Sequence, residues 1–354
     1  MAKKSTTNTN FESARKGKND EFYTILTDIE KELKHYKKQF RDKVVYCNCD
    51  DPRISNFFLY FSYNFEKLGL KKLITTCFKN QDRDLFSRHD SEKAIYLEYN
   101  GDLNHNNIPD PEEIGIKELK GDGDFRSRES IELLKQADIV VTNPPFSLFR
   151  EYVAQLLEYD KKFLIIGNGN SITYKEIFKN IQDNKLWLGV TKPQHFLIDN
   201  KEKFAKYCSD DNKVMVGDKE YWEINISVGT PTYWFTNLDV SKRHEDIILY
   251  KSYTPEEYPK YDNYDAIEVG KVTEIPMDYK GAMGVPITFL TKYNPDQFEI
   301  LGITDRENES GLKTKVYTKE DAPNPGDLNR RAALKIGDTY KSTYARLLIK
   351  HKRL

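Results

Sequence analysis

The segment Ile139–Phe146 (IVVTNPPF) joins an apolar run to an Asn-Pro-Pro-aromatic turn, and the residues after it predict a helix over Leu148–Leu157. A short apolar run bounded by a turn is typical of a buried strand. The residue before a proline leaves the helical region, and each proline fixes its φ angle and lacks an N–H. The turn is therefore stiff and presents carbonyl oxygens. In open α/β sheets, ligands bind beyond such strand ends.

The four residues of this turn suit the binding of a planar amino group. The Asn143 side-chain oxygen and the Pro144 carbonyl are placed to accept two N–H bonds from one NH2, and Phe146 offers a face for a stacked base. Asn143, Pro144, Pro145 and Phe146 are thus the catalytic candidates for methylation of an exocyclic amine. The alternative is a tight strand-to-helix turn without chemistry, because Asn-Pro is a common turn dipeptide.

The chemistry of an aromatic amine explains these residue types. Its lone pair is delocalised into the ring, so two acceptors must draw the nitrogen toward tetrahedral geometry against a methyl sulfonium. Positive charge then moves from sulfur to nitrogen, and the acceptors stabilise the transition state more than the ground state. A base within a duplex must first be flipped out. Stacking on Phe146, worth about 1–3 kcal/mol, offsets part of that cost.

Length and composition limit the class of protein. The chain has 354 residues, of which 38% are hydrophobic and 31% charged, with a net charge of −1. No apolar run approaches the roughly 20 residues that span a bilayer, and the polar start lacks the apolar core of a signal peptide. The four cysteines lack a two-pair spacing, so we expect a cytoplasmic protein without a metal site. We expect residues 1–19 to be disordered.

The order of predicted elements indicates an α/β fold. A helical period in Phe22–Phe40 precedes alternating strands and helices, which predicts a mostly parallel sheet with helices on both faces. After about residue 210 the runs are strand-like and separated by turn residues. The predicted strands are 44–47, 72–78, 94–99, 118–119, 139–142, 163–167, 222–228, 232–236, 247–250 and 287–290, and the predicted helices after the first are 56–68, 130–136 and 148–157.

The loop after the first strand is the predicted cofactor site. It runs from Cys47 through Asp50, Asp51 and Pro52 without a glycine, which disfavours a dinucleotide or phosphate ligand. Its carboxylates suit the ammonium group of the methionine part of S-adenosylmethionine, or alternatively they only begin the next helix. In the turn Gly121–Phe125, Asp124 and Phe125 suit an adenine amino group and ring, although Asp-Gly turns are common. Tyr23 is an aromatic candidate that is equally suited to the core.

Several strings make the chain resemble the EcoRI-type adenine-specific DNA methyltransferases, the modification enzymes of restriction systems and their phage relatives. The likeness spans most of the chain, in the segments 20–24 (DEFYT), 45–52 (VYCNCDDP), 143–146 (NPPF), 167–178 (GNGNSITYKEIF), 233–238 (YWFTNL), 261–267 (YDNYDAI) and 284–289 (GVPITF).

That resemblance implies N6-methylation of a flipped-out adenine in a short sequence of duplex DNA, with S-adenosylmethionine as donor. It implies a Rossmann-like class I methyltransferase sheet with a C-terminal DNA-recognition portion. Residue by residue, Asn143–Phe146 match the catalytic motif, and Asp50–Pro52 stand where the cofactor motif belongs, although the wider pattern has glycines there. The resemblance also implies a monomer and, where a cognate restriction endonuclease exists, no stable complex with it.

On this basis we expect a catalytic domain at 20–240 and a recognition portion at 241–354. Its DNA-binding candidates are two basic pairs, Lys242 with Arg243 and Arg330 with Arg331. The segments 192–219 and 305–331 carry the amide and basic side chains that base readout requires. The two segments are equally compatible with solvated loops, and basic pairs of this kind more often belong to a solvated surface than to a phosphate contact.

Two other classes of function stay open on the sequence alone. An Asn-Pro-Pro-aromatic turn suits any planar NH2, so cytosine N4, RNA or a protein glutamine is an alternative methyl acceptor. The second alternative is a non-catalytic DNA-binding protein with a methyltransferase fold, against which the intact segment Asn143–Phe146 argues.

Overall fold

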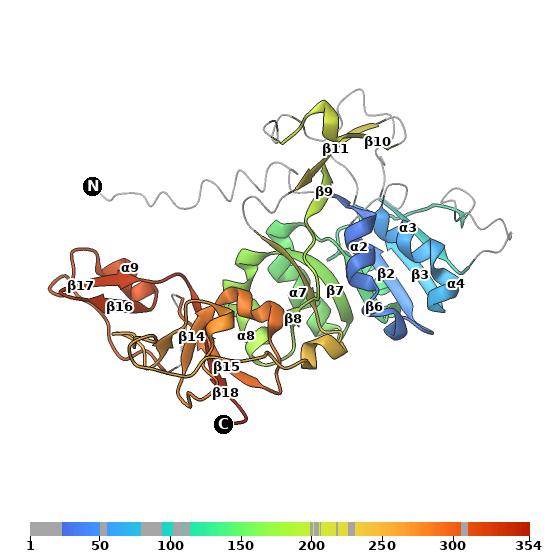
Figure 1. Cartoon of the computed structure of the whole chain (residues 1–354). Helices are drawn as coiled ribbons and strands as arrows, with labels where there is room; N and C mark the ends of the chain where they lie inside the picture. The colour runs from blue at the N-terminus through green and yellow to red at the C-terminus, as the bar shows by residue number, and fades with distance from the viewer. Residues whose placement is uncertain are drawn as a thin grey trace, which may run out of the picture. The chain divides into compact units, whose positions relative to one another are not determined.

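The computed structural model describes residues 23–49, 55–78, 94–101, 109, 114–198, 201, 205, 207–216, 219–225, 231–305 and 311–354. The tail predicted at 1–19 and the loop residues Asp50, Asp51 and Pro52 lie outside this part of the chain. The chain divides into two compact units (Figure 1). Unit 1 is Met1–Ser171 with Gly189–Leu238, and unit 2 is Ile172–Leu188 with Asp239–Leu354.

The core of unit 1 is a sheet whose strands follow the order β5-β4-β3-β2-β6-β7-β12. The central strands β3, β2, β6 and β7 are parallel to one another. Strands β4 and β12 run antiparallel to β3 and β7, and β5 runs antiparallel to β4. The bounds are β2 Val44–Asn48, β3 Lys72–Thr76, β4 Ile95–Tyr99, β5 Lys117–Glu118, β6 Ile139–Thr142, β7 Lys162–Asn168 and β12 Thr232–Thr236.

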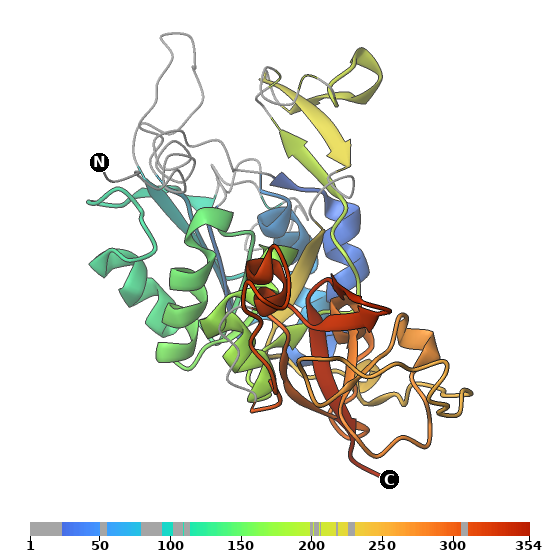
Figure 2. The same ribbon diagram turned by 90° about the vertical axis from the view of Figure 1, so that its left-hand side faces the viewer.

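Helices cover both faces of this sheet, with α2 and α3 on one face and α6 and α7 on the other (Figure 2). For that reason β2 and β6 are buried along their whole length, and they are apolar up to their last residues, Asn48 and Thr142. Ser55 and Ser127 begin α3 and α6 by accepting the N–H groups of Phe58 and Ser130. The bounds are α2 Leu26–Leu33, η1 Lys37–Gln39, α3 Asn56–Tyr63, α4 Phe65–Leu68, α6 Arg128–Gln136, η2 Phe146–Leu148, α7 Phe149–Glu158 and η3 Gly169–Thr173.

A glycine in β7 allows close packing beneath the expected catalytic turn. A Cβ atom at Gly167 would lie 2.5 Å from the Phe149 ring and 2.9 Å from the Phe235 ring. Those two rings are themselves 4.9 Å apart. The absence of a side chain at Gly167 therefore leaves room for the ring pair of Phe149 and Phe235, which joins α7 to β12.

A second sheet of unit 1 has the order β1-β9-β11-β10 and extends away from the central sheet (Figures 1 and 2). Its small core consists of Ile198, Trp222 and Ile224. All of its pairings are antiparallel. The bounds are β1 Tyr23–Thr24, β9 His195–Ile198, η4 Asp210–Asn212, β10 Lys213–Val216 and β11 Lys219–Asn225.

Two buried carboxylates of α2 hold the segment that leads into β9. Glu32 accepts the N–H groups of Val190 (2.8 Å) and Thr191 (2.6 Å), and the hydroxyls of Thr191 and Tyr36. One turn earlier, Asp28 accepts the backbone N–H groups of Gln194 and His195. Burial acts to raise the pKa of Asp28, but these N–H donors and Lys31 hold it below its usual value. The base of the second sheet is therefore fixed to α2 by charge-assisted hydrogen bonds.

Unit 2 is built on a sheet of order β13-β14-β18-β15 and a two-stranded ribbon of β16 and β17. Helix α8 contributes Gln182, which donates to the Leu301 carbonyl in β15. Strand bounds are β8 Trp187–Leu188, β13 Ile267–Glu268, β14 Met283–Pro286, β15 Phe298–Ile303, β16 Ala333–Ile336, β17 Thr339–Ser342 and β18 Arg346–His351. The helices are α8 Lys175–Gln182, η5 Ser241–His244, η6 Val272–Glu274, η7 Ile287–Lys292 and α9 Pro325–Arg330.

The predictions of strands at residues 287–290 and 247–250 in unit 2 are wrong. Residues 287–290 form the 3-10 helix η7, which begins after Pro286 and buries Phe289 and Leu290. Residues 247–250 are irregular. The backbone N–H and carbonyl of Ile247 are both hydrogen-bonded to the side chain of Gln297, so they do not pair with a neighbouring strand. In unit 1, the predicted helix 56–68 is divided at Asn64, whose side chain donates to the Tyr60 carbonyl.

Within the described residues, no helix has both the length and the apolar character that crossing a membrane requires.

Candidate active site

The catalytic candidates lie where the direction of the sheet's connections reverses. From β2 the chain continues outward to β3 on one side, and from β6 it continues to β7 on the other, while β2 and β6 are parallel neighbours. The carboxyl ends of these two strands are Asn48 and Thr142. A crevice at such a switch point is where open α/β sheets bind their ligands. Asn143 is the first residue beyond it.

The turn after β6 has the stiff form that its two prolines predict. Asn143 is 7% exposed and its Oδ1 atom is buried, while Pro144 is buried and Phe146 half-buried. Pro145 has φ −54° and ψ 126°, and its carbonyl accepts the N–H of Leu148 at 3.0 Å. The chain then forms η2 and α7, so the predicted helix after the motif is confirmed with a start at Phe149.

Asn48 joins the two strands behind this turn, and sequence reasoning missed it. Its backbone carbonyl accepts the hydroxyl of Thr142, and its side-chain Oδ1 accepts the hydroxyl of Tyr152 from α7. Burial raises the pKa of Tyr152 well above its ordinary value, so the phenol stays a neutral donor. Asn48 and Tyr152 are 104 positions apart, and no local signal in the sequence pairs them.

The strand end of the predicted cofactor site has a conformation that glycine normally supplies. Cys47 is buried within β2, which ends at Asn48. The following residue, Cys49, has a φ angle of +86°. Few side chains tolerate this region of backbone space. Although the sequence after β2 lacks a glycine, its backbone therefore enters the left-handed region at Cys49.

This strain leads to a stability prediction for Cys49. Cys49→Gly should leave the free energy of unfolding unchanged or raise it, because glycine adopts a positive φ without a steric cost. Cys49→Val should lower it by about 1–3 kcal/mol, because a β-branched side chain opposes that conformation. Denaturant titration of both variants checks the order, and a valine variant as stable as the glycine variant would contradict the assigned backbone.

The acidic turn 121–125 lies at the end of β3 and beside Tyr152. Gly123 has φ +76°, and a Cβ atom there would overlap the carbonyl oxygen of Cys77. Phe125 packs edge-on against Tyr152, with the ring centroids 5.0 Å apart. The turn is thus brought next to the hydrogen-bonded pair of Asn48 and Tyr152.

Asp124 has a strong partner within its own turn. Its carboxylate accepts the backbone N–H of Arg126 at 2.8 Å and the guanidinium at 2.9 and 2.7 Å, and that guanidinium also contacts Glu151. These donors hold the pKa of Asp124 below its usual value. Asp124 is therefore an ionised acceptor whose orientation is fixed by Arg126.

Tyr23 lies where the second sheet meets the start of α3. Its ring contacts Tyr221 edge-on at 5.9 Å, and the neighbouring Thr24 carbonyl accepts the side-chain N–H of Asn56 at 2.8 Å. Asn56 is the first residue of α3, directly after the loop predicted to bind the cofactor. Tyr23 thus contacts β11 through its ring, and its neighbour Thr24 is hydrogen-bonded to the first residue of α3.

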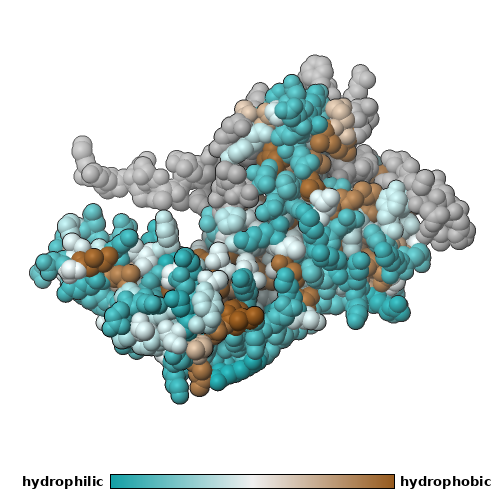
Figure 3. Space-filling model, viewed as in Figure 1, coloured by the Kyte–Doolittle hydropathy of each residue, from teal (hydrophilic) through white to brown (hydrophobic). Residues whose placement is uncertain are grey.

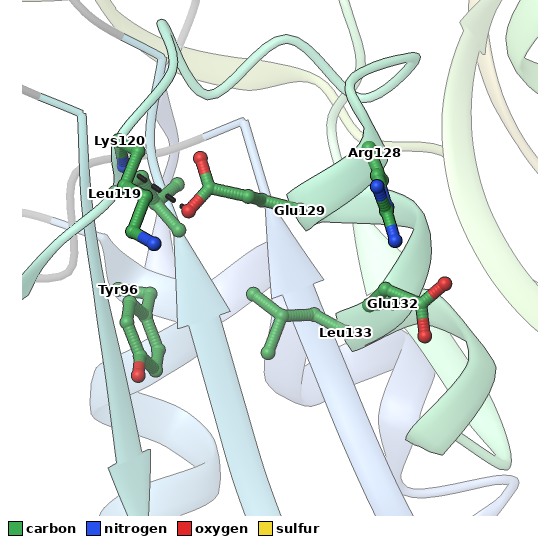
Figure 4. A pocket seen from close by; sticks show the side chains of 7 residues that line it. All are labelled: Tyr96, Leu119, Lys120, Arg128, Glu129, Glu132 and Leu133. Atoms are coloured by element: carbon green, nitrogen blue, oxygen red, sulfur yellow. Dashed lines mark hydrogen bonds between the residues drawn. The ribbon is translucent and has the colours of Figure 1, made fainter.

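A pocket of about 440 Å³ opens on the other side of the acidic turn, between β4 and α6 (Figure 4). Glu129 lies in its wall and accepts the N–H groups of Lys120 and Gly121. None of the predicted site residues lines it. The lining residues are Tyr96, Leu119, Lys120, Arg128, Glu129, Glu132 and Leu133. The pocket is thus separate from the residues that the sequence analysis singled out.

The two basic pairs predicted to bind DNA are both in unit 2, and they differ in exposure. Lys242 is exposed, whereas the Arg243 side chain is 8% exposed, with its guanidinium 3.9 Å from the Trp187 ring centroid and hydrogen-bonded to Asn184. Arg331 forms an ion pair with Asp305. The Arg330 side chain is 42% exposed. Phosphate binding by these residues stays a prediction. The contact of Arg243 with Trp187 packs η5 against β8.

His244 gives unit 2 a pH-dependent ion pair. Its ring nitrogens contact Asp296 at 2.7 Å and Asp239 at 2.9 Å, and these carboxylates raise the pKa of His244 above 6.5. The stabilisation is therefore complete below about pH 6.5 and is lost as the pH rises through the higher folded-state value. Thermal unfolding of the wild type and His244→Gln should differ most near pH 6 and converge at higher pH. A constant difference would contradict the pairing.

Among the described residues, no group of three or more His, Cys, Asp or Glu side chains is arranged to hold a metal ion. The four cysteines form no disulfide.

Comparison with known proteins identifies the family. The family model described as "Adenine-specific methyltransferase EcoRI" matches residues 10–352. The chain is 46% identical to the Type II methyltransferase M.EcoRI of Escherichia coli, with 98% of each chain covered. It is 36% identical to M.MgeORF184P of Mycoplasma genitalium (97% of this chain, 99% of the relative) and to M.MpnI of Mycoplasma pneumoniae (97% and 98%). No solved structure matches the chain. The chain belongs to the EcoRI family of adenine-specific methyltransferases, and it is an enzyme that methylates adenine in DNA.

Proposed function

We propose that the protein transfers a methyl group from S-adenosylmethionine to the N6 amino group of an adenine flipped out of duplex DNA. The observation that carries this proposal is the buried Asn143 side chain at the switch point of the sheet, immediately beyond β6. Asn143 Oδ1 and the Pro144 carbonyl accept the two amino hydrogens, and Phe146 stacks on the adenine. Pro145 sets the direction of the turn through its φ of −54°.

These residues act mainly by position and electrostatics. A nitrogen held by two acceptors in a dry site is presented to the methyl group at an effective molarity worth roughly 7–11 kcal/mol in favourable cases. Because positive charge develops on that nitrogen during transfer, Asn143 Oδ1 binds it more strongly in the transition state. The burial of Asn143 and Pro144 supports this role, because the acceptors have little water to compete for them.

The residues near the switch point fit S-adenosylmethionine. When bound, it supplies an electrophilic methyl group on sulfur. Cys49, with its positive φ angle, directly follows Asn48 at the carboxyl end of β2. Ionised Asp124 offers an acceptor to the adenine amino group of the cofactor, and Phe125 offers an apolar face. We propose Asp50, Asp51, Pro52 and Tyr23 as further contacts, from the resemblance of the sequence.

We further propose that the sheet of unit 1 is the Rossmann-like class I methyltransferase sheet and that residues 241–354 form the recognition portion. The parallel core β3-β2-β6-β7 with antiparallel β12 beside β7 supports the first assignment. The exposed Lys242 and Arg330 support the second. We propose a cytoplasmic monomer that shares its DNA sequence with a cognate restriction endonuclease, where one exists, without forming a stable complex with it.

The test is transfer of labelled methyl from S-adenosylmethionine to unmethylated duplex DNA, followed by digestion and identification of the labelled nucleoside. Label in N6-methyladenine supports the proposal. Label in N4-methylcytosine, in RNA or in a protein glutamine would keep the chemistry and overturn the acceptor. Failure of the protein to bind S-adenosylmethionine or to label any acceptor would overturn the proposed reaction.

A further inference from the structure

The β16–β17 ribbon of unit 2 is an exposed antiparallel hairpin. It turns at Gly337, with φ +59°, and Asp338. Lys335, Ile336, Thr339 and Lys341 are all exposed, and Ile336 is 56% exposed despite its apolar side chain. Ile336 and Thr339 are cross-strand partners next to the turn and therefore share one face. In Figures 1 and 3 the ribbon projects from the sheet of its unit, with apolar atoms on its surface.

The base of the ribbon is held rigidly. The Asn263 side chain accepts the N–H of Ala333 at 2.8 Å and donates to the carbonyls of Leu328 and Arg331. The Lys315 ammonium lies 4.7 and 4.9 Å from the ring centroids of Tyr317 and Tyr340 and 3.2 Å from Asp262. Because the base is fixed, the ribbon loses little conformational entropy when the exposed side chains at its tip contact a partner.

The tip carries two exposed lysines, Lys335 and Lys341, and one exposed carboxylate, Asp338, so its net positive charge favours a polyanionic partner. The ion pairs nearby belong to Lys315, Arg330 and Arg331, and among the described residues none involves Lys335 or Lys341. The β10–β11 ribbon of unit 1 differs, because its Lys213 forms an ion pair with Glu220 and follows the acidic pair Asp210 and Asp211. Within the described residues, the β16–β17 ribbon therefore combines lysines that form no ion pair with an exposed apolar side chain next to its turn.

We propose that the β16–β17 ribbon enters the major groove of the DNA substrate and reads part of its sequence. The major groove admits a two-stranded ribbon. There Ile336 contacts a thymine methyl group and the Thr339 hydroxyl bonds a base edge, while Lys335 and Lys341 contact phosphates. This inference rests on the proposed assignment of DNA recognition to residues 241–354.

The first test concerns sequence preference. Wild type, Ile336→Ala/Thr339→Ala and a control, Ile248→Ala, would each methylate duplex DNA that has been amplified from a bacterial genome and therefore carries no methyl marks. Ile248 is 87% exposed in an irregular segment of the same unit, so the control removes an exposed side chain of the same type outside the ribbon. Sequencing of the methylated adenines gives the ratio of methylation at the preferred sequence to sequences differing by one base. That ratio should fall about 5- to 100-fold in the ribbon variant. It should stay unchanged in the control.

The second test concerns the phosphates. Lys335→Gln/Lys341→Gln should weaken binding to all duplex sequences alike and reduce the slope of log K against log salt by about 2. The control Lys280→Gln/Lys292→Gln removes two exposed cations from the same unit and should change the slope less. Equal slopes for the two double variants would overturn the proposed phosphate contacts.

The outcomes separate this inference from the proposed function. If the ribbon variants keep both the wild-type sequence preference and the salt slope while the wild type makes N6-methyladenine, the ribbon proposal is wrong and methyl transfer stands. If the wild type makes no N6-methyladenine in the amplified DNA, the proposed function itself fails. Thermal unfolding verifies that each variant is folded.

Discussion

Asn143→Ala should reduce methyl transfer by at least about 10²–10³-fold in kcat while binding of cofactor and DNA is retained. Loss of one preorganised partner of the developing charge has an effect of that size in other enzymes. We expect kcat to fall more than binding because Asn143 Oδ1 interacts with the amino group most strongly during transfer. The affinity for DNA, in contrast, comes largely from phosphate contacts. Single-turnover transfer and equilibrium binding of each ligand measure the two quantities separately.

The matched variant is Asn143→Asp, which keeps an acceptor oxygen in the same place. It should retain measurable transfer, because the carboxylate still accepts a hydrogen bond from the amino group. If Asn143→Ala weakened binding and transfer equally, Asn143 would only shape the turn between β6 and η2. If it left transfer intact, the proposed acceptor role would be wrong.

Glu32→Ala should lower the free energy of unfolding of unit 1 by about 3–5 kcal/mol. The Glu32 carboxylate is fully buried and accepts four hydrogen bonds, from Val190, Thr191 and Tyr36. Its removal leaves buried donors without an acceptor, and each such group costs about 1–3 kcal/mol. The backbone at 190–191 would also lose its attachment to α2. Denaturant titration measures the loss.

Glu30→Ala is the control for Glu32, because Glu30 lies on the same helix but is exposed. We expect it to change stability by less than about 0.5 kcal/mol. Glu32→Gln should have an intermediate effect, because an amide keeps one acceptor oxygen and adds two donors with no place for them. A similar loss of stability in Glu32→Ala and Glu30→Ala would show that Glu32 does not hold residues 190–191 to α2.

The parts of the fold that the sequence predicted best are those with strong local signals. The strands Ile139–Thr142 and Thr232–Thr236 are apolar runs bounded by turn residues, and both bounds are confirmed. The end of the helical segment at Gly69 is also confirmed, since that residue has φ +64°. Burial on both faces of a sheet requires such continuous apolar runs, so local pattern and tertiary structure agree there.

The predictions failed where distant residues decide the conformation. Residues 287–290 have a strand-like composition, but a short apolar run does not distinguish a strand from a helical turn. Ile247 bonds to the side chain of Gln297, 50 positions away. The same reason explains why Tyr152 was missed at the site. Its importance comes from contacts with Asn48 and Phe125, which the chain brings together only on folding.

The contact between Gly167 and Phe149 restricts how this family can diverge. A side chain at position 167 would enter the space of the Phe149 and Phe235 rings. Such a change is therefore acceptable only in a lineage that has already reduced one of those rings. Across related sequences, positions 149, 167 and 235 should covary in size, although they belong to three separate segments of the chain.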